Sequence, residues 1–121
     1  HRGRGVMTFT LVGPTIFPSA AWTTLSVANG TGDVRVYGRG AGPQDGFAGY
    51  KAFGDPPRPR WGDYGATAVD GSSIWMASEY IGQSCTFQQY VADTPSSPQF
   101  TCGNTRTSLA NWGTRISRVA P

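Results

Sequence analysis

The sequence has few of the residues that build helix surfaces or bind metals. Among its 121 residues are one lysine (Lys51), one glutamate (Glu79) and one histidine. Exposed helix positions are normally filled by lysine, glutamate, alanine, leucine, glutamine and arginine, so the composition argues against a helical bundle or coiled coil. One histidine and two cysteines cannot form a four-ligand structural zinc site of the usual kind. We therefore expect no metal and no cofactor.

Long apolar runs and basic runs are also missing. No stretch approaches the ~20 apolar residues that a membrane-spanning helix needs. Ten basic residues against seven acidic ones give a formal net charge of +3, but the basic residues are scattered. A nucleic-acid footprint is a basic stripe or a known module, and neither is visible. The sequence therefore predicts neither a membrane span nor a nucleic-acid partner.

Glycine, proline and aromatic residues are what the chain has in quantity. It contains 17 glycines, 9 prolines and 12% aromatic residues. Glycine and proline disfavour helices, whereas this aromatic content suffices for a packed core. The composition predicts one all-β unit over residues 1–121, with residues 38–60 as a Gly/Pro-rich connector.

Six segments have the β-branched and aromatic content of strands. The turn sequences Asn29-Gly30 and Asp70-Gly71 supply the positive φ of hairpin loops. The strongest hairpin joins residues 64–69 to 73–79, and a short helical turn is expected at 87–91. The predicted strands are 6–12, 21–28, 34–37, 64–69, 73–79 and 112–119, with the second and third paired.

Two cysteines, Cys85 and Cys102, flank a loop-like segment rich in serine, threonine and proline. A disulfide between them would constrain the unfolded chain by about 3 kcal/mol, and disulfides persist in oxidising compartments. We predict a disulfide in a secreted protein. Two buried free thiols in a cytosolic protein are the alternative.

A local pattern adds a family resemblance. Residues 60–64 read Arg-Trp-Gly-Asp-Tyr, a later strand ends in Glu79-Tyr80, and residues 112–114 read Trp-Gly-Thr. Over about residues 58–119 this combination resembles the C-terminal part of secreted bacterial β-propeller proteins of the sialidase-like or BNR-repeat-like kind. The resemblance implies antiparallel sheets forming about two blades of a β-propeller-like fold. A small β-sandwich is the alternative.

The length of the chain bears on that fold. A propeller needs at least four blades of four strands, at roughly 40–50 residues per blade, and 121 residues supply about two. We therefore expect a fragment, a cleavage product or a subunit. Another chain or a missing segment would complete the propeller, or the chain would form a homo-oligomer.

The resemblance also implies candidate site residues. Sialidases hold a substrate carboxylate with arginines and use a tyrosine nucleophile assisted by glutamate, with an aspartate as acid. The catalytic candidates are Glu79, Tyr80 and Asp63, and the ligand-binding candidates are Arg60, Tyr64, Trp61 and Arg115. The competing interpretation is structural: Arg60 or Arg115 pairs with an acidic residue to lock the blades together. No full aspartate box is present.

Three functions follow as hypotheses. The first is an extracellular binding or scaffold module with a glycan as candidate ligand, because one of its tryptophans could stack on sugar rings. The second is part of a sialidase-like glycoside hydrolase completed by another chain. The third is a structural subunit that assembles through exposed strand edges. Asn29-Gly30-Thr31 has the form of an N-glycosylation acceptor, although a hairpin turn explains it equally well.

Overall fold

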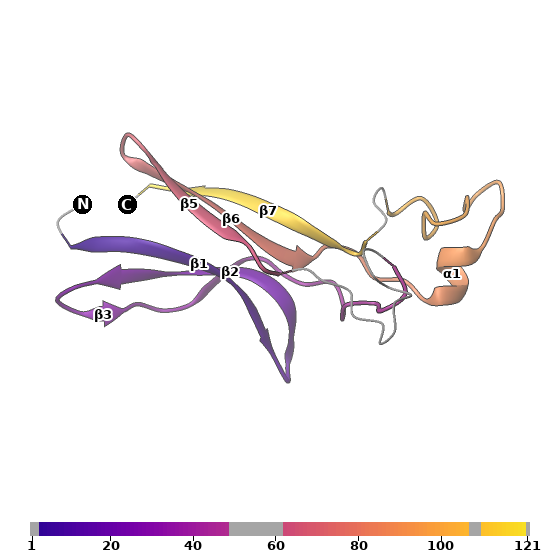
Figure 1. Ribbon diagram of the computed structural model, residues 1–121, viewed down its shortest axis with the longest axis horizontal. Helices are drawn as coiled ribbons and strands as arrows, with labels where there is room; N and C mark the ends of the chain where they lie inside the picture. The colour runs from indigo at the N-terminus through magenta and orange to yellow at the C-terminus, as the bar shows by residue number, and fades with distance from the viewer. Residues whose placement is uncertain (1–2, 49–61, 107–109, 121) are drawn as a thin grey trace.

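The computed structural model describes residues 3–48, 62–106 and 110–120, which form two antiparallel sheets and one short helix (Figure 1). The predicted all-β, antiparallel class is therefore confirmed. Within these ranges the sheets close neither into a barrel nor into a propeller. The elements are β1 Arg4–Gly13, β2 Ile16–Ser26, β3 Gly30–Thr31, β4 Arg35–Gly38, β5 Gly65–Asp70, β6 Ser73–Ile81, α1 Phe87–Val91 and β7 Trp112–Val119.

The N-terminal sheet is built on a long hairpin of β1 and β2, and β2 pairs with β3 and β4 on its other side. The predicted pairing of the second and third segments is the β2–β4 pair. However, β2 begins at Ile16, not at residue 21. Pro18 lies between the paired residues Ile16 and Ser19, where the β1–β2 register shifts. A proline, which has no N–H to donate, is tolerated in a strand at such an irregularity.

The C-terminal sheet follows the order β5-β6-β7. Its first hairpin turns at Gly71, whose φ is +57°, and Asp70 pairs with Ser73 across the turn. A positive φ at the first central position is what a type II′ hairpin turn requires, and glycine supplies it readily. The predicted hairpin is therefore present, and β7 has the predicted bounds.

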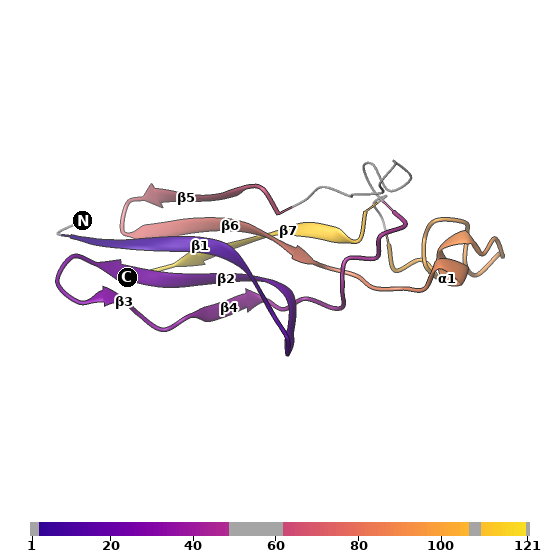
Figure 2. The same ribbon diagram turned by 60° about the horizontal axis from the view of Figure 1, so that its bottom comes forward.

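The two sheets stack face to face, as the view along them shows (Figure 1) and the rotated view agrees (Figure 2). Thr10 Oγ1 donates a hydrogen bond of 2.8 Å to the carbonyl oxygen of Glu79. A Cβ on Gly65 would lie 3.4 Å from Thr8, and one on Gly38 would lie 3.0 Å from the side chain of Arg115. These close approaches place β1 over β5 and β4 over β7.

The core between and around the sheets is small. Met76 and Ile81 are its largest fully buried apolar side chains among the described residues, and Ala20 and Ala21 are the other buried apolar residues of the strands. Alanines, serines and threonines occupy much of the interface. The layers therefore approach closely where glycines allow it, rather than being held apart by large side chains.

A separate lobe follows β6. Its disulfide joins Cys85 and Cys102 with a Cα–Cα distance of 6.0 Å, as predicted. The helix α1 covers Phe87–Val91, also as predicted. Thr86 caps it in a capping box with Gln89, which satisfies two backbone N–H groups at the helix start. The predicted connector at 38–60 is described as far as residue 48, and residues 39–48 contain neither strand nor helix.

Candidate ligand-binding groove

The predicted catalytic pair, Glu79 and Tyr80, occupies adjacent positions on β6. Successive side chains of a strand point to opposite faces of the sheet, so the structure does not bring these two groups together. Glu79 is 8% exposed, and its carboxylate accepts a hydrogen bond from the backbone N–H of Gly62. The Tyr80 ring lies on the other face, beside Gly82 and Gly113.

Two further candidates lie just before β5. Asp63 is exposed, and the Tyr64 side chain is 81% exposed. Arg60 and Trp61 fall outside the described residues. Tyr64 therefore stands in solvent, away from the space between the sheets.

Arg115 lies on β7, opposite Ser78 of β6. It shares the face of Ser78, whereas Glu79 points to the other face. The stem of its side chain packs beside Gly38 of the N-terminal sheet. The structural alternative of an Arg115–Glu79 pair is therefore not formed. Arg115 instead contributes to the contact between the two sheets.

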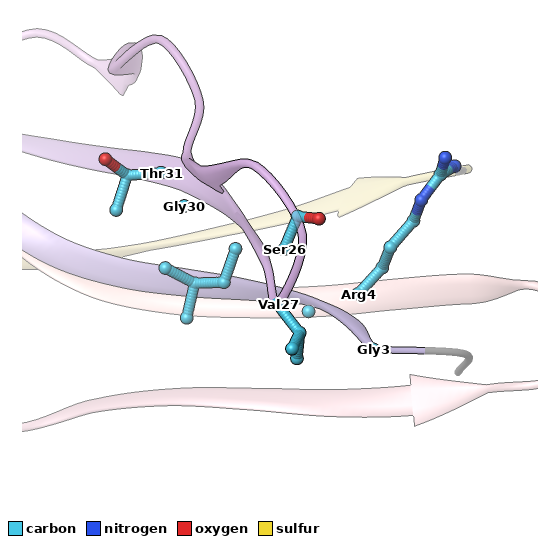
Figure 3. A pocket seen from close by; sticks show the side chains of 8 residues that line it. Gly3, Arg4, Ser26, Val27, Gly30 and Thr31 are labelled. Carbon is cyan, nitrogen blue, oxygen red and sulfur yellow. The ribbon is translucent and has the colours of Figure 1, made fainter.

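A groove opens between the sheets at the end that holds the β2–β3 and β5–β6 turns. It has a volume of about 1080 Å³, slightly above the roughly 300–1,000 Å³ typical of small-ligand sites. The N-terminal sheet lines it with Val6, Trp22 and Thr24, and the C-terminal sheet with Thr67 and Ile74. A second hollow of about 420 Å³ adjoins it, where Arg4, Ser26 and Gly30 also line the surface (Figure 3).

Local sequence explains why the groove is at this end. Near Gly65 and Gly38 the absence of side chains lets the sheets meet. Toward the turns the inward positions combine large side chains, such as Trp22, with short polar ones, such as Thr24 and Thr67, and together these side chains line the groove. The layers part in this direction (Figure 1). The groove is therefore a consequence of uneven spacing between two sheets.

The walls of the groove combine an aromatic ring with hydroxyl and amide groups. Trp22 is half-buried, and the Arg35 guanidinium lies 5.3 Å from the centre of its ring. A cation so placed is attracted to the ring and restrains it. Hydroxyl or amide groups come from Thr24, Ser26, Asn29, Thr31, Thr67, Ser72 and Ser73. Such walls can hold a ligand with apolar faces and many hydrogen-bonding groups.

The sequence alone offers four tryptophans as candidates for stacking on a sugar ring, but it indicates neither Trp22 in particular nor the groove. The signal available was the run of serines and threonines at alternate positions of strands that otherwise looked ordinary. That signal identifies a polar face, but only the packing of the two sheets shows that the faces enclose a space.

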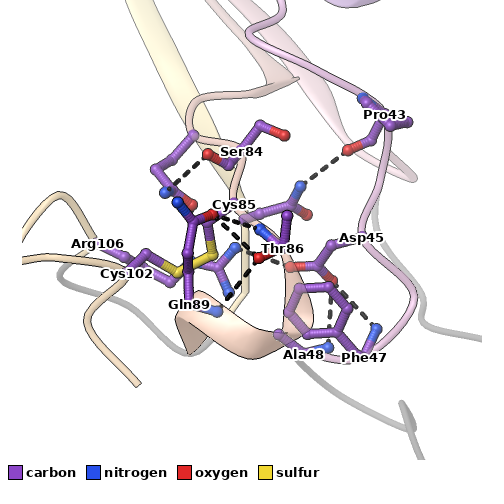
Figure 4. A network of polar contacts seen from close by, with 12 residues as sticks. Pro43, Asp45, Phe47, Ala48, Ser84, Cys85, Thr86, Gln89, Cys102 and Arg106 are labelled. Carbon is purple, nitrogen blue, oxygen red and sulfur yellow. Dashed lines mark hydrogen bonds and ion pairs between the residues drawn. A yellow bond between two sulfur atoms is a disulfide. The ribbon is translucent and has the colours of Figure 1, made fainter. Parts of the chain in front are cut away.

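The charged residues most deeply buried lie away from this groove, between residues 39–48 and the disulfide lobe (Figure 4). Arg106 Nη2 lies 2.8 Å from Asp45 Oδ2, and these side chains are 1% and 4% exposed. Arg106 Nε also donates to Gln83 at 2.9 Å, and its guanidinium lies over Tyr90. Asp45 compensates the charge of Arg106, and Gln83 accepts a further hydrogen bond from it. We therefore interpret this cluster as structural.

No group of three or more potential metal ligands gathers among the described residues. Over the same residues, no helix is long and apolar enough to cross a membrane. No family model, curated protein or solved structure matches this chain.

Proposed function

We propose that this chain is an extracellular binding module that holds a glycan in the groove between its sheets. The observation that carries the proposal is the combination of Trp22 on one wall with hydroxyl-bearing side chains, including Thr67, on the other. Sugar rings have apolar faces that stack on aromatic rings and hydroxyl edges that exchange hydrogen bonds. The disulfide supports an extracellular location, since disulfides persist in oxidising compartments.

The resemblance to sialidase-like propellers supports a second part of the proposal. Two antiparallel sheets stacked face to face are compatible with neighbouring blades, and another chain or segment would then complete the ring. A small β-sandwich remains the alternative fold. Among the residues that the structure describes, β5 and β7 each pair with a strand on one side only, which supports the structural-subunit hypothesis because unpaired edges can accept strands from a partner.

The hydrolase alternative receives less support from the geometry. Glu79 and Tyr80 face opposite sides of β6, an arrangement that does not favour their acting as base and nucleophile on one substrate atom. Replacement of Glu79 by glutamine and of Tyr80 by phenylalanine tests this alternative on a panel of glycosides. A loss of hydrolysis in either variant would support catalysis over simple binding.

The binding proposal is tested by titrating the protein with a panel of glycans in a calorimeter. We expect Trp22→Ala to weaken binding by about tenfold, equivalent to ~1.4 kcal/mol, since it removes the stacking surface. Thr67→Val removes one hydroxyl from the opposite wall at nearly constant shape, and a smaller loss is expected.

Trp75→Ala is the matched control. Trp75 is 40% exposed and lies on the outer face of the C-terminal sheet, opposite to the face that lines the groove. Equal losses in Trp22→Ala and Trp75→Ala would refute the groove as the site. Thermal unfolding of each variant separates a lost fold from a lost ligand, and absence of any glycan binding by the parent protein refutes the proposal itself.

A further inference from the structure

The N-terminal wall of the groove is longer than one sugar ring. Trp22, Thr24 and Ser26 line it from β2, and they share one face because side chains of a strand repeat every second residue. From Trp22 to Ser26 the strand rises by about 13 Å. Bonds of about 1.5 Å make a pyranose ring with its linking oxygen about 5 Å long. About three rings in a row therefore span this wall.

The C-terminal wall has a matching length. Thr67 and Val69 of β5 share the face of the buried Met76, and Gly71 and Ser72 form the end of the wall at the hairpin turn. Four residues separate Thr67 from Gly71, again a rise of about 13 Å. The β2–β3 and β5–β6 turns lie at the same end of the molecule (Figure 2). An extended ligand can therefore touch both walls over the same distance.

Stacking is available in one part of the groove only. Among the described residues that line it, Trp22 is the one aromatic side chain. The hydroxyl groups of Ser26 and Ser72 line the groove at the end nearer the turns. A single sugar stacked on Trp22 would leave both of these groups in water. A chain of rings that begins on Trp22 reaches them.

The recess also continues beyond Ser26. The hollow of about 420 Å³ shares Ser26 and Gly30 with the groove and extends past them to Gly3 and Val27 (Figure 3). Val27 is 91% exposed, so its side chain does not close this end. A chain that fills the groove can therefore leave it at the turns and continue into solvent.

We propose that the ligand of the groove is a linear oligosaccharide of at least three rings. One ring stacks on Trp22, and the following rings are held by hydrogen bonds from both walls toward Ser26 and Ser72. This inference rests on the proposed glycan binding and adds that the ligand is a chain, not a single sugar.

A chain-binding groove makes affinity depend on ligand length. Each further ring adds contacts, whereas the loss of translational and rotational freedom is incurred once for each ligand. We expect the association constant to rise at least tenfold from one ring to three. A site for one ring would gain only threefold, because a trisaccharide offers it three rings instead of one. Beyond four rings the association constant should rise only with the number of ways in which the chain can be placed.

Calorimetric titration of the whole chain with oligosaccharides of increasing length tests the proposal. The probes are cello-, chito-, malto- and galacturono-oligosaccharides, each from one ring to six. A rise of tenfold or more between one ring and three, in any series that binds, is the expected result. A rise of threefold or less in every binding series would overturn the chain and leave glycan binding standing. Absence of binding in all four series would overturn both proposals.

Two variants separate the ends of the groove. Trp22→Ala should weaken every member of a series by a similar factor, because each ligand places a ring there. Ser72 is exposed at the turn, and Ser72→Ala removes one hydrogen-bonding group. It should weaken ligands of three or more rings by about threefold and leave a monosaccharide unaffected.

Ser96→Ala is the matched control, since it removes an exposed hydroxyl from the disulfide lobe. It should leave the affinity unchanged at every length. Thermal unfolding confirms that each variant keeps its fold. An equal loss in Ser72→Ala for one ring and for four contradicts the chain, and so does the absence of any loss in that variant.

Discussion

The two-sheet body and the disulfide lobe are stabilised in different ways. In the body, long strands pair in regular ladders, but few large apolar side chains are fully buried between them. The lobe has one short helix, yet it contains a disulfide and shares a buried ion pair and a chain of aromatic contacts with residues 39–48. Phe47, Tyr90 and Phe100 follow one another with ring centres 5.3 and 5.1 Å apart.

The comparison shows that a region with little helix or strand can be held together by side-chain contacts between distant segments. Backbone hydrogen bonds between strands define each sheet of the body, but they do not join the two sheets to each other at the groove. In the lobe, side-chain bonds replace ladders, and each ties together segments distant in sequence, such as Asp45 and Arg106. We expect the stability of the lobe to depend on a few groups and the stability of the body to depend on many small contacts.

The largest effect should come from the buried ion pair. Arg106→Met leaves the Asp45 carboxylate buried with two backbone N–H donors, those of Phe47 and Ala48. Removing one partner of a buried pair destabilises a protein by about 3–5 kcal/mol. The free energy of unfolding from urea titration measures this loss. The double variant Asp45→Asn/Arg106→Met should recover part of it, and a loss below ~1 kcal/mol in the single variant contradicts a structural role.

The disulfide should have the next largest effect. Replacing both cysteines by serine frees a loop whose closure stabilises the fold by about 3 kcal/mol. Amide exchange should rise first in the lobe, for example at Phe100, whose N–H donates to Tyr90 at 2.7 Å. Amides of the β6–β7 ladder should keep their protection. If both sets lose protection together, the lobe and the body unfold as one unit.

A smaller effect is expected from the core between the sheets. Met76→Ala removes a buried side chain from the face of β6 that meets the N-terminal sheet. Such truncations destabilise by 2–5 kcal/mol in general, and we expect about 2 because this thin interface can close over part of the cavity. Thermal unfolding measures the loss. Amide exchange in the lobe should be unchanged by Met76→Ala at temperatures below the unfolding transition. Faster exchange in the lobe at those temperatures would argue that the lobe and the body are not stabilised separately.

Local chemistry made several elements predictable. The bounds of α1 and β7 agree with the sequence prediction, and for β7 the local signal is a run of β-branched and aromatic residues. The turn at Asp70-Gly71 and the disulfide were predictable for the same reason. The start of β2 was not predictable, since the register shift that accommodates Pro18 depends on the pairing of β2 with β1.

The site was less predictable than the fold. Ile74, Met76 and Ser78 share one face of β6, and Trp75, Ala77 and Glu79 share the other, but alternation along a strand does not say which face meets another sheet. That choice depends on close approaches at Gly38 and Gly65, each involving residues far away in the chain. The adjacent Glu79-Tyr80 pair suggested chemistry because the residue types fit, although strand geometry separates them.

The short loop after β5 has a consequence for how this surface could change during evolution. Only Gly71 and Ser72 separate the paired residues Asp70 and Ser73, so this loop fixes which half of β6 faces inward. A one-residue insertion that shifted β6 against its neighbours would exchange the two halves. Trp75, Ala77 and Glu79 would then face the other sheet without a single substitution in the strand. The insertion of one residue at a surface turn can thus change which side chains of β6 line the space between the two sheets.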